Sequence, residues 1–234
     1  MEATLADLER VQTRILRRIA ELELSHLPQN HLSESLPVAS SHTNCGQDNS
    51  GTVARLSAML RSNGVNDFLF KRVPSDYYDW TLESRREILG AASVDHLCKS
   101  IVLVNTQAPS NVVDCSDRNY SKYYIVVVQY TARFNAETVK NFLYSLNNGQ
   151  LSKKKFNMRL APEETSVKLT GYGHNAVTCI GMQTDIPVIL DEAIVKLTPD
   201  FFWLGGGEVD LKLGVRTSEF INFVKPFIFS CSGA

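Results

Sequence analysis

Two dense runs of β-branched and aromatic residues constrain most strongly what this chain can fold into. The first covers residues 100–104, and the second covers residues 123–130. A strand with one solvated face alternates apolar and polar residues, whereas these runs contain almost no polar position. They therefore predict two central strands of a sheet that is covered on both faces.

Helical patterns alternate irregularly with these strands. Four helices are expected from apolar periodicity and from the residues that start and stop helices, over residues 52–64, 81–92, 136–146 and 218–224. Three further strands are expected over residues 186–190, 201–204 and 209–213. This mixed order predicts an α+β domain rather than a doubly wound parallel sheet.

The first 27 residues form a separate segment. Their apolar residues recur at three-then-four spacing with charged residues between them, which predicts an amphipathic, coiled-coil-like helix within residues 1–27. This helix either packs on its own domain or binds a partner helix, including a second copy of the chain. Residues 28–51 are rich in Ser, Asn, Gln, His and Gly and predict a flexible linker, so the globular domain is expected over residues 52–234.

Composition and charge exclude several classes of protein. The formal net charge of −1 argues against a high-affinity polyanion binder, although Lys153, Lys154, Lys155 and Arg159 form a local basic patch. No apolar run is long enough to span a membrane, and the first residues lack the pattern of a secretory signal, so a cytoplasmic location is expected. The five cysteines are widely spread and show no zinc spacing, so no metal or other cofactor is expected.

A glycine-rich loop over residues 169–182 leads into the strand at 186–190, and a second glycine turn, Gly205 to Gly207, lies between the last two expected strands. Glycines allow the bare backbone to approach a ligand closely. The two turns are expected to face each other across one pocket, although glycine turns between strands often have only a structural role.

Four segments together resemble the YbaK/ProX-type aminoacyl-tRNA editing domain family, whose members hydrolyse wrongly charged tRNA. The segments are residues 96–104, 169–182, 186–192 and 203–213, and the resemblance extends over about residues 52–225. It implies an α+β fold with a mixed, barrel-like sheet surrounded by helices.

The resemblance also implies roles for individual residues. Lys99 falls where the family has its functional lysine, which holds the charged 3′ end of the tRNA or the aminoacyl ester. Backbone groups of the two glycine turns act as oxyanion donors and substrate contacts. We assign catalysis to Lys99, Gly181 and Gly206, and substrate binding to Gly171, His174, Asn175, Thr178, Asp191, Gly205 and Gly207.

Three of these assignments leave alternatives open. Asp191 either binds the substrate amino group or caps a following helix at Ala193. Asn175 and Cys179 replace the glycine and proline of the family's loop pattern, so the loop either reaches the same shape by other means or binds without hydrolysing. His174 and Cys179 form a weaker nucleophilic alternative.

The sequence therefore predicts a trans-editing deacylase that hydrolyses the ester of a tRNA mischarged with a small amino acid. The basic patch is expected to guide the acceptor end. The alternative is an inactive editing-like domain that binds tRNA or a synthetase, with docking through the N-terminal helix.

Overall fold

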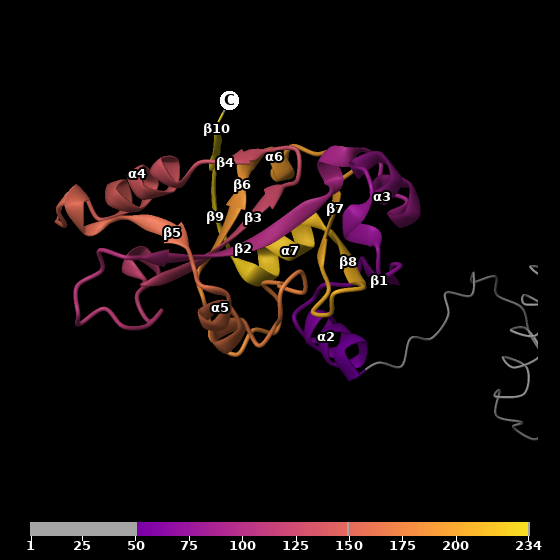
Figure 1. Cartoon of the computed structure of the whole chain (residues 1–234), viewed down its shortest axis with the longest axis horizontal. Coiled ribbons are helices and arrows are strands. Elements are labelled where there is room, and N and C mark those ends of the chain that lie inside the picture. Colours follow the sequence, from indigo (N-terminus) through magenta and orange to yellow (C-terminus); the bar gives the residue numbers. More distant parts are fainter. Residues whose placement is uncertain (1–50, 149, 234) are drawn as a thin grey trace, which may run out of the picture. The chain divides into compact units, whose positions relative to one another are not determined.

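The computed structural model describes residues 51–148 and 150–233. The predicted N-terminal helix, and all but the last residue of the predicted linker, lie outside these residues. The described elements are traced in Figure 1 and comprise α2 (Gly51–Ser62), β1 (Phe68–Arg72), η1 (Tyr77–Asp79), α3 (Leu82–Leu89), η2 (Val94–His96), β2 (Cys98–Asn105), η3 (Arg118–Tyr120), β3 (Tyr123–Gln129), β4 (Arg133–Phe134), α4 (Ala136–Leu146), η4 (Lys153–Lys155), β5 (Met158–Leu160), α5 (Glu163–Thr170), β6 (Val188–Asp191), α6 (Glu192–Val195), β7 (Phe201–Gly205), β8 (Leu211–Arg216), α7 (Thr217–Val224), β9 (Phe227–Phe229) and β10 (Ser232–Gly233).

The two apolar runs form β2 and β3, which lie inside a five-stranded sheet of order β5-β2-β3-β6-β9. Alternate residues of β3 belong to two different hydrophobic cores, one on each face of the sheet. Ile125 and Val127 pack with residues of β6, β7 and β8, whereas Tyr124, Val126 and Val128 pack with residues of α4. Because successive side chains of a strand point to opposite faces, both faces of this sheet are buried. The prediction of two doubly covered central strands is confirmed.

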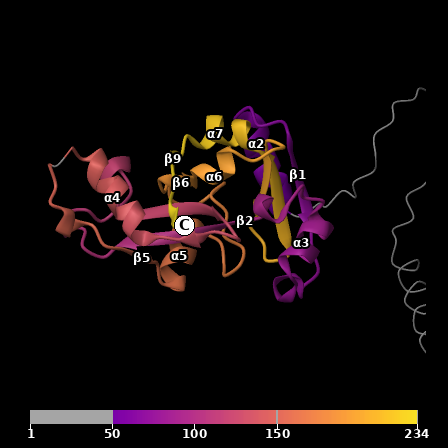
Figure 2. The same cartoon turned by 90° about the horizontal axis from the view of Figure 1, so that it is seen from above.

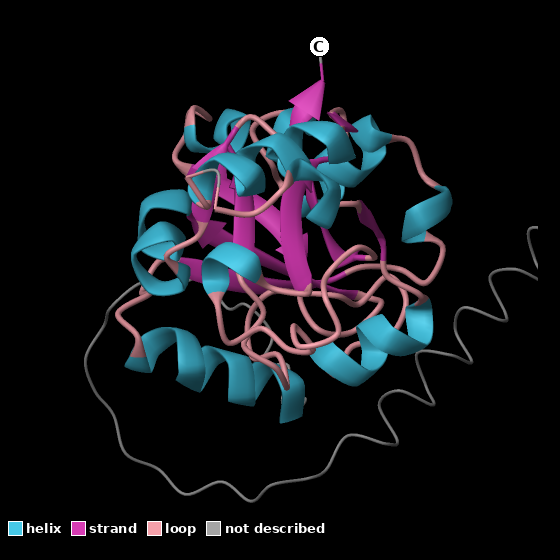
Figure 3. Ribbon diagram, turned by 90° about the vertical axis from the view of Figure 1, so that its left-hand side faces the viewer, coloured by secondary structure: helices cyan, strands magenta, loops and turns pink. Residues whose placement is uncertain are grey.

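The helices lie on both sides of the strands, which occupy the middle of the domain in Figure 3. Helix α4 covers one face of the five-stranded sheet through Val139 and Leu143, which are fully buried. On the other face lie α2 and α7, together with a three-stranded antiparallel sheet of order β1-β8-β7. Figures 1 and 2 both place α4 at one end of the domain and α3 at the other.

The sheets are mixed but do not close into a barrel, so this part of the expected fold is wrong. The five-stranded sheet contains antiparallel pairs at β2 and parallel pairs at β6, and it ends at β5 and β9. Between the two larger sheets, the described residues make one isolated bridge, from Leu97 to Trp203. Closure needs continuous strand pairing around the sheet, and the three-residue edge strands β5 and β9 do not pair with each other.

Most expected elements differ by a few residues from their predicted bounds, and two of these differences have a clear local reason. Helix α3 ends at Leu89, before the predicted limit, because Gly90 takes a left-handed conformation with φ 70° and caps the helix. Strand β8 begins at Leu211, two residues late, because the Leu211 amide donates a hydrogen bond to the Glu208 carbonyl in a turn. In the described ranges, every helix is too short or too polar to cross a membrane.

Candidate functional site

One cavity of about 390 Å³ collects residues from several elements that carry the predicted site. Its walls come from β2, β7, η1, α5 and the glycine loop, defined here as residues 171–182. Lys99, His174, Asn175 and Gly205 all line it. The fold therefore brings together the predicted lysine, part of the loop and the start of the second glycine turn.

Lys99 is the second residue of β2 and is partly exposed in the cavity. Its Nζ lies 5.6 Å from the centroid of the Tyr130 ring, a distance at which an ammonium is attracted to the aromatic face. Within the described residues, no carboxylate lies at ion-pair distance from it. Its charge is therefore available to an oxygen of a ligand.

The cavity-lining part of the glycine loop contains a tight turn. The Ala176 amide donates to the Gly173 carbonyl at 3.1 Å, and Asn175, the third residue of this turn, has φ 60°. A type II turn requires positive φ at this position, which Gly and Asn adopt most easily. Asn175 thus takes the left-handed conformation that glycine would take at the same place.

The second glycine turn touches the loop directly at Gly205. A Cβ added to Gly205 would collide with the backbone carbonyl oxygen of Val177, so a glycine is required for this close approach. The two glycine segments therefore face each other, and they meet at the wall of the cavity.

The other glycines of the predicted site have packing roles. A Cβ at Gly181 would lie 2.7 Å from atoms of Arg55 and Leu56 in α2, and a Cβ at Gly207 would meet Tyr172. The Gly206 amide already donates to the Leu211 carbonyl at 2.9 Å. Gly171, with φ 80°, is the C-cap of α5. None of these four is among the residues that line the cavity.

Two predicted polar contacts are buried away from the cavity. Thr178 is fully buried, and its hydroxyl accepts a hydrogen bond from the Ile180 amide. Asp191 is 1% exposed and accepts from the Ala193 amide at 2.9 Å, which makes it the N-cap of α6. Its other oxygen accepts from the amide and the thiol of Cys231. Of the two roles considered for Asp191, the structure contains the cap.

Two cavity residues, Tyr78 and Lys212, were not singled out from the sequence. The Lys212 ammonium donates to the Tyr78 hydroxyl at 2.7 Å, and that hydroxyl donates to the Asn175 carbonyl at 2.6 Å. Burial lowers the pKa of Lys212 to about 8 and raises the pKa of Tyr78 above its usual value. The available sequence signal was a lysine between Leu211 and Leu213, at the start of a strand that continues with Gly214 and Val215.

Unused hydrogen-bonding groups also line the cavity. In the part of the chain that the structure describes, the backbone amides of Gly173, His174 and Asn175 donate to no protein acceptor. The Ser100 hydroxyl is buried and likewise has no partner. Gly173, His174 and Asn175 are exposed, so their amides are open to water or to a ligand, whereas a buried hydroxyl such as that of Ser100 is normally paired.

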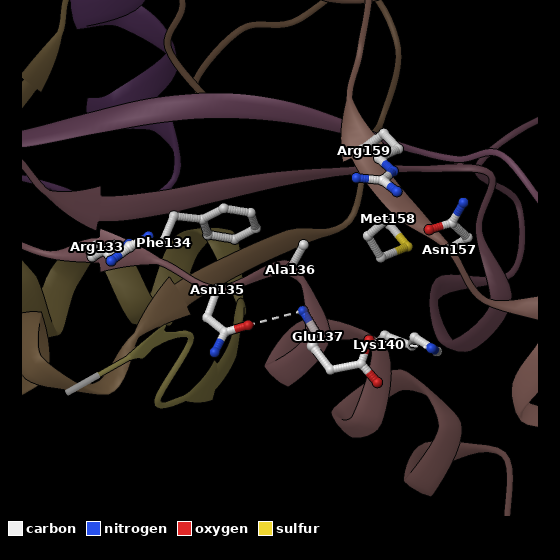
Figure 4. A pocket seen from close by; sticks show the side chains of 9 residues that line it. All are labelled: Arg133, Phe134, Asn135, Ala136, Glu137, Lys140, Asn157, Met158 and Arg159. Carbon is white, nitrogen blue, oxygen red and sulfur yellow. Dashed lines mark hydrogen bonds and ion pairs between the residues drawn. The ribbon is translucent and has the colours of Figure 1, made fainter.

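The predicted basic patch lies at a second cavity, of about 500 Å³, shown in Figure 4. Arg159 lines this cavity together with Arg133 and Lys140, whereas its neighbour Leu160 lines the first cavity. Lys153, Lys154 and Lys155 form the exposed η4 turn, and Lys153 lies 3.9 Å from Glu137 of α4. Arg159 and the η4 lysines therefore lie outside the cavity that Lys99 lines.

All four cysteines in the described ranges are buried. Cys179 is 6% exposed, and burial raises the pKa of its thiol to about 12, whereas His174 is exposed. A thiol in this environment is not a nucleophile at neutral pH. In the described ranges, no group of three or more His, Cys, Asp or Glu residues is placed to hold a metal ion.

The model of the aminoacyl-tRNA editing domain matches residues 87–223, which include Lys99, the glycine loop and the second glycine turn. No curated protein matches the chain.

Several solved structures share the fold. A candidate trans-editing enzyme for prolyl-tRNA synthetase has a TM-score of 0.61 at 18% identity, covering 79% of this chain and 99% of that chain. A structure from work on epitope backbone grafting onto scaffold proteins has a TM-score of 0.59 at 16% identity, with coverage of 79% and 99%. A hypothetical protein gives 0.56 at 18% identity, with coverage of 76% and 99%. At such identities, the likeness concerns the fold alone.

Proposed function

This chain belongs to the aminoacyl-tRNA editing domain family, and we propose that it is a trans-acting deacylase for tRNA mischarged with a small amino acid. The observation that carries this proposal is the cavity at which Lys99 and the glycine loop meet. Small apolar side chains differ too little for a synthetase pocket to separate them fully, which is the physical reason that such hydrolysis is needed.

Hydrolysis of an aminoacyl ester requires few protein groups. An aminoacyl ester is already activated, so the protein must place a water molecule and stabilise the oxyanion of the tetrahedral intermediate. The free amides of Gly173, His174 and Asn175 are suitable donors, and one well-placed donor contributes about 3–4 kcal/mol in other enzymes. These amides take the place of Gly181 and Gly206 in the proposal, because the latter two pack elsewhere.

Lys99 supplies the positive charge of the site. Its ammonium has no carboxylate partner among the described residues, so it can pair with the terminal phosphate or polarise the ester carbonyl. Arg159 lies within β5, and the η4 lysines precede that strand. None of them lines the cavity of Lys99, so they would contact a more distant part of the acceptor stem.

The test is a deacylation assay with the full chain. Transfer RNAs that carry Ala, Ser, Cys or Thr are incubated with the wild type and with Lys99→Ala, and loss of the amino acid is followed. We expect hydrolysis of at least one substrate by the wild type, and a loss of about 100-fold in Lys99→Ala. The control is Lys196→Ala, which removes an exposed lysine paired with Glu192 and lies outside the cavity.

The assay also separates the alternative function. Hydrolysis of none of the four substrates would reject the deacylase proposal. If the protein then still bound tRNA in a way that depended on Lys99, the inactive binding module would be favoured. The departures from the family pattern at Asn175 and Cys179 are the observations that keep this alternative open.

A further inference from the structure

The turn of the glycine loop is held from outside by Tyr78 in η1. The Tyr78 hydroxyl donates to the Asn175 carbonyl at 2.6 Å, across 97 positions of the chain. Inside the turn, the Ala176 amide makes the closing bond to Gly173 at 3.1 Å. These two contacts fix the backbone on both sides of Asn175.

Asn175 benefits from such support because positive φ costs free energy for any residue with a Cβ, although Asn tolerates it better than most residues. Residues other than glycine rarely take positive φ, and they remain there when the surrounding structure holds them. A hydrogen bond to the Asn175 carbonyl fixes the orientation of the peptide that follows it. The free amides of Gly173, His174 and Asn175 belong to this same turn, so their direction depends on it.

The chemistry of the groups sets the direction of each hydrogen bond. An ammonium donates and cannot accept, whereas a phenol has one proton and two acceptor positions. Lys212 therefore donates to the Tyr78 oxygen, and the single Tyr78 proton is directed to the Asn175 carbonyl. Lys212 acts on the loop through Tyr78, without touching the loop itself.

The surroundings hold Lys212 in place. Its Nζ also donates to the Val209 carbonyl at 2.9 Å and lies 4.4 Å from the Tyr78 ring centroid and 5.0 Å from that of Tyr77. Lys212 is only 4% exposed. A buried ammonium lowers the stability of the fold unless its surroundings compensate, and the contacts of Lys212 with Tyr78, Val209 and the two rings supply such compensation.

We propose that Tyr78 and Lys212 are positioning residues, which hold the Asn175 turn in the conformation that aims the loop amides into the cavity. This inference rests on the proposed function for its role in the reaction. The hydrogen-bond relay itself can be tested without any activity.

The first experiment measures amide hydrogen exchange at Ala176 by NMR. Ala176 is 4% exposed, and its amide closes the turn. We expect Tyr78→Phe to accelerate its exchange about two- to tenfold, the factor that matches the loss of one net hydrogen bond. The matched control is Tyr77→Phe, because the Tyr77 hydroxyl makes no hydrogen bond in the described structure and its loss leaves the exchange unchanged.

Lys212→Met tests the second member of the relay. As a single substitution, Lys212→Met is expected to accelerate Ala176 exchange less than Tyr78→Phe does. Added to Tyr78→Phe, it is expected to cause no further acceleration, because Lys212 acts on the turn only through the Tyr78 hydroxyl. Equal exchange at Ala176 in the wild type and in Tyr78→Phe would overturn the relay. Additive effects of the two substitutions would overturn the assigned role of Lys212.

The second experiment connects the turn to the reaction. In the deacylation assay, Tyr78→Phe is expected to lower kcat about tenfold with little change in KM, while Tyr77→Phe keeps both values. Faster exchange with unchanged kcat would overturn the role of the turn in the reaction. If the wild type hydrolyses no substrate, the proposed function fails, and the exchange data still decide the relay.

Discussion

Lys212 makes a specific prediction about stability and pH. Burial lowers its pKa from 10.5 to about 8, which at 1.36 kcal/mol per pH unit corresponds to about 3 kcal/mol against folding when the group is charged. Between these two pH values the unfolded chain holds more protons at this site than the folded chain. The contribution of Lys212 to stability therefore rises as pH increases from 8 towards 10.5.

Lys212→Met removes this charge and keeps a similar volume. At pH 7 the variant avoids a cost of about 3 kcal/mol and loses two hydrogen bonds of about 1 kcal/mol each, to Tyr78 and Val209, so it is expected to be slightly more stable than the wild type. At pH 10 most of the charge is absent, and the variant is expected to be less stable. The difference between the two proteins should change by about 2.5 kcal/mol between pH 7 and pH 10.

The assay is urea unfolding of the full chain at several pH values, with Lys196→Met as the control. Lys196 is exposed and pairs with Glu192 at 2.8 Å on the surface, so its removal is expected to change stability by less than about 0.5 kcal/mol at any pH. A stability difference between Lys212→Met and the wild type that stays constant from pH 7 to pH 10 would refute the argument. It would mean that Lys212 is not an ammonium buried at a cost.

Two further predictions concern the loop. Gly205→Ala is expected to lower the free energy of unfolding in urea by about 1–3 kcal/mol, because its Cβ meets the rigid Val177 carbonyl. Gly173→Ala has open space around its Cβ and should change this free energy by less than about 0.5 kcal/mol. Equal losses in the two variants would contradict the close approach at Gly205. Burial raises the pKa of the Cys179 thiol to about 12, so we expect this thiol to resist iodoacetamide at pH 8 until the protein unfolds. The variant Cys179→Ala should retain deacylation activity. Rapid labelling of Cys179 in the native protein, mapped by mass spectrometry, would contradict its burial.

The central strands and the main helices were predictable because their signals are local. The apolar runs identified β2 and β3, and Asn135 correctly marked the start of α4, where its side chain accepts from two amides of the first turn. Such patterns depend on neighbouring residues alone. Short edge elements such as β5 and β9, with three residues each, have no comparable pattern and were missed.

The details of the site depend on contacts between distant residues, which one sequence does not reveal. Tyr78 and Lys212 are 134 positions apart, and no sequence pattern links them, although Lys212 lies within the segment 203–213. A glycine that allows close approach, such as Gly205, also cannot be distinguished by pattern from one that only packs, such as Gly206. Lys99 and part of the glycine loop line one cavity, as do Asn175 and Gly205, whereas Gly171, Thr178 and Gly181 do not.

The incomplete pairing of β2 has a consequence for solubility. Its inner edge pairs with β3 from Cys98 to Val104, whereas β5 pairs only with its last three residues. An unpaired strand edge is a template for aggregation between molecules, and here the edge from Cys98 to Val102 borders the cavity that α5 and the glycine loop also line. We expect these cavity walls to shield the edge from a second molecule, so that the proposed ligand site also limits self-association through β2.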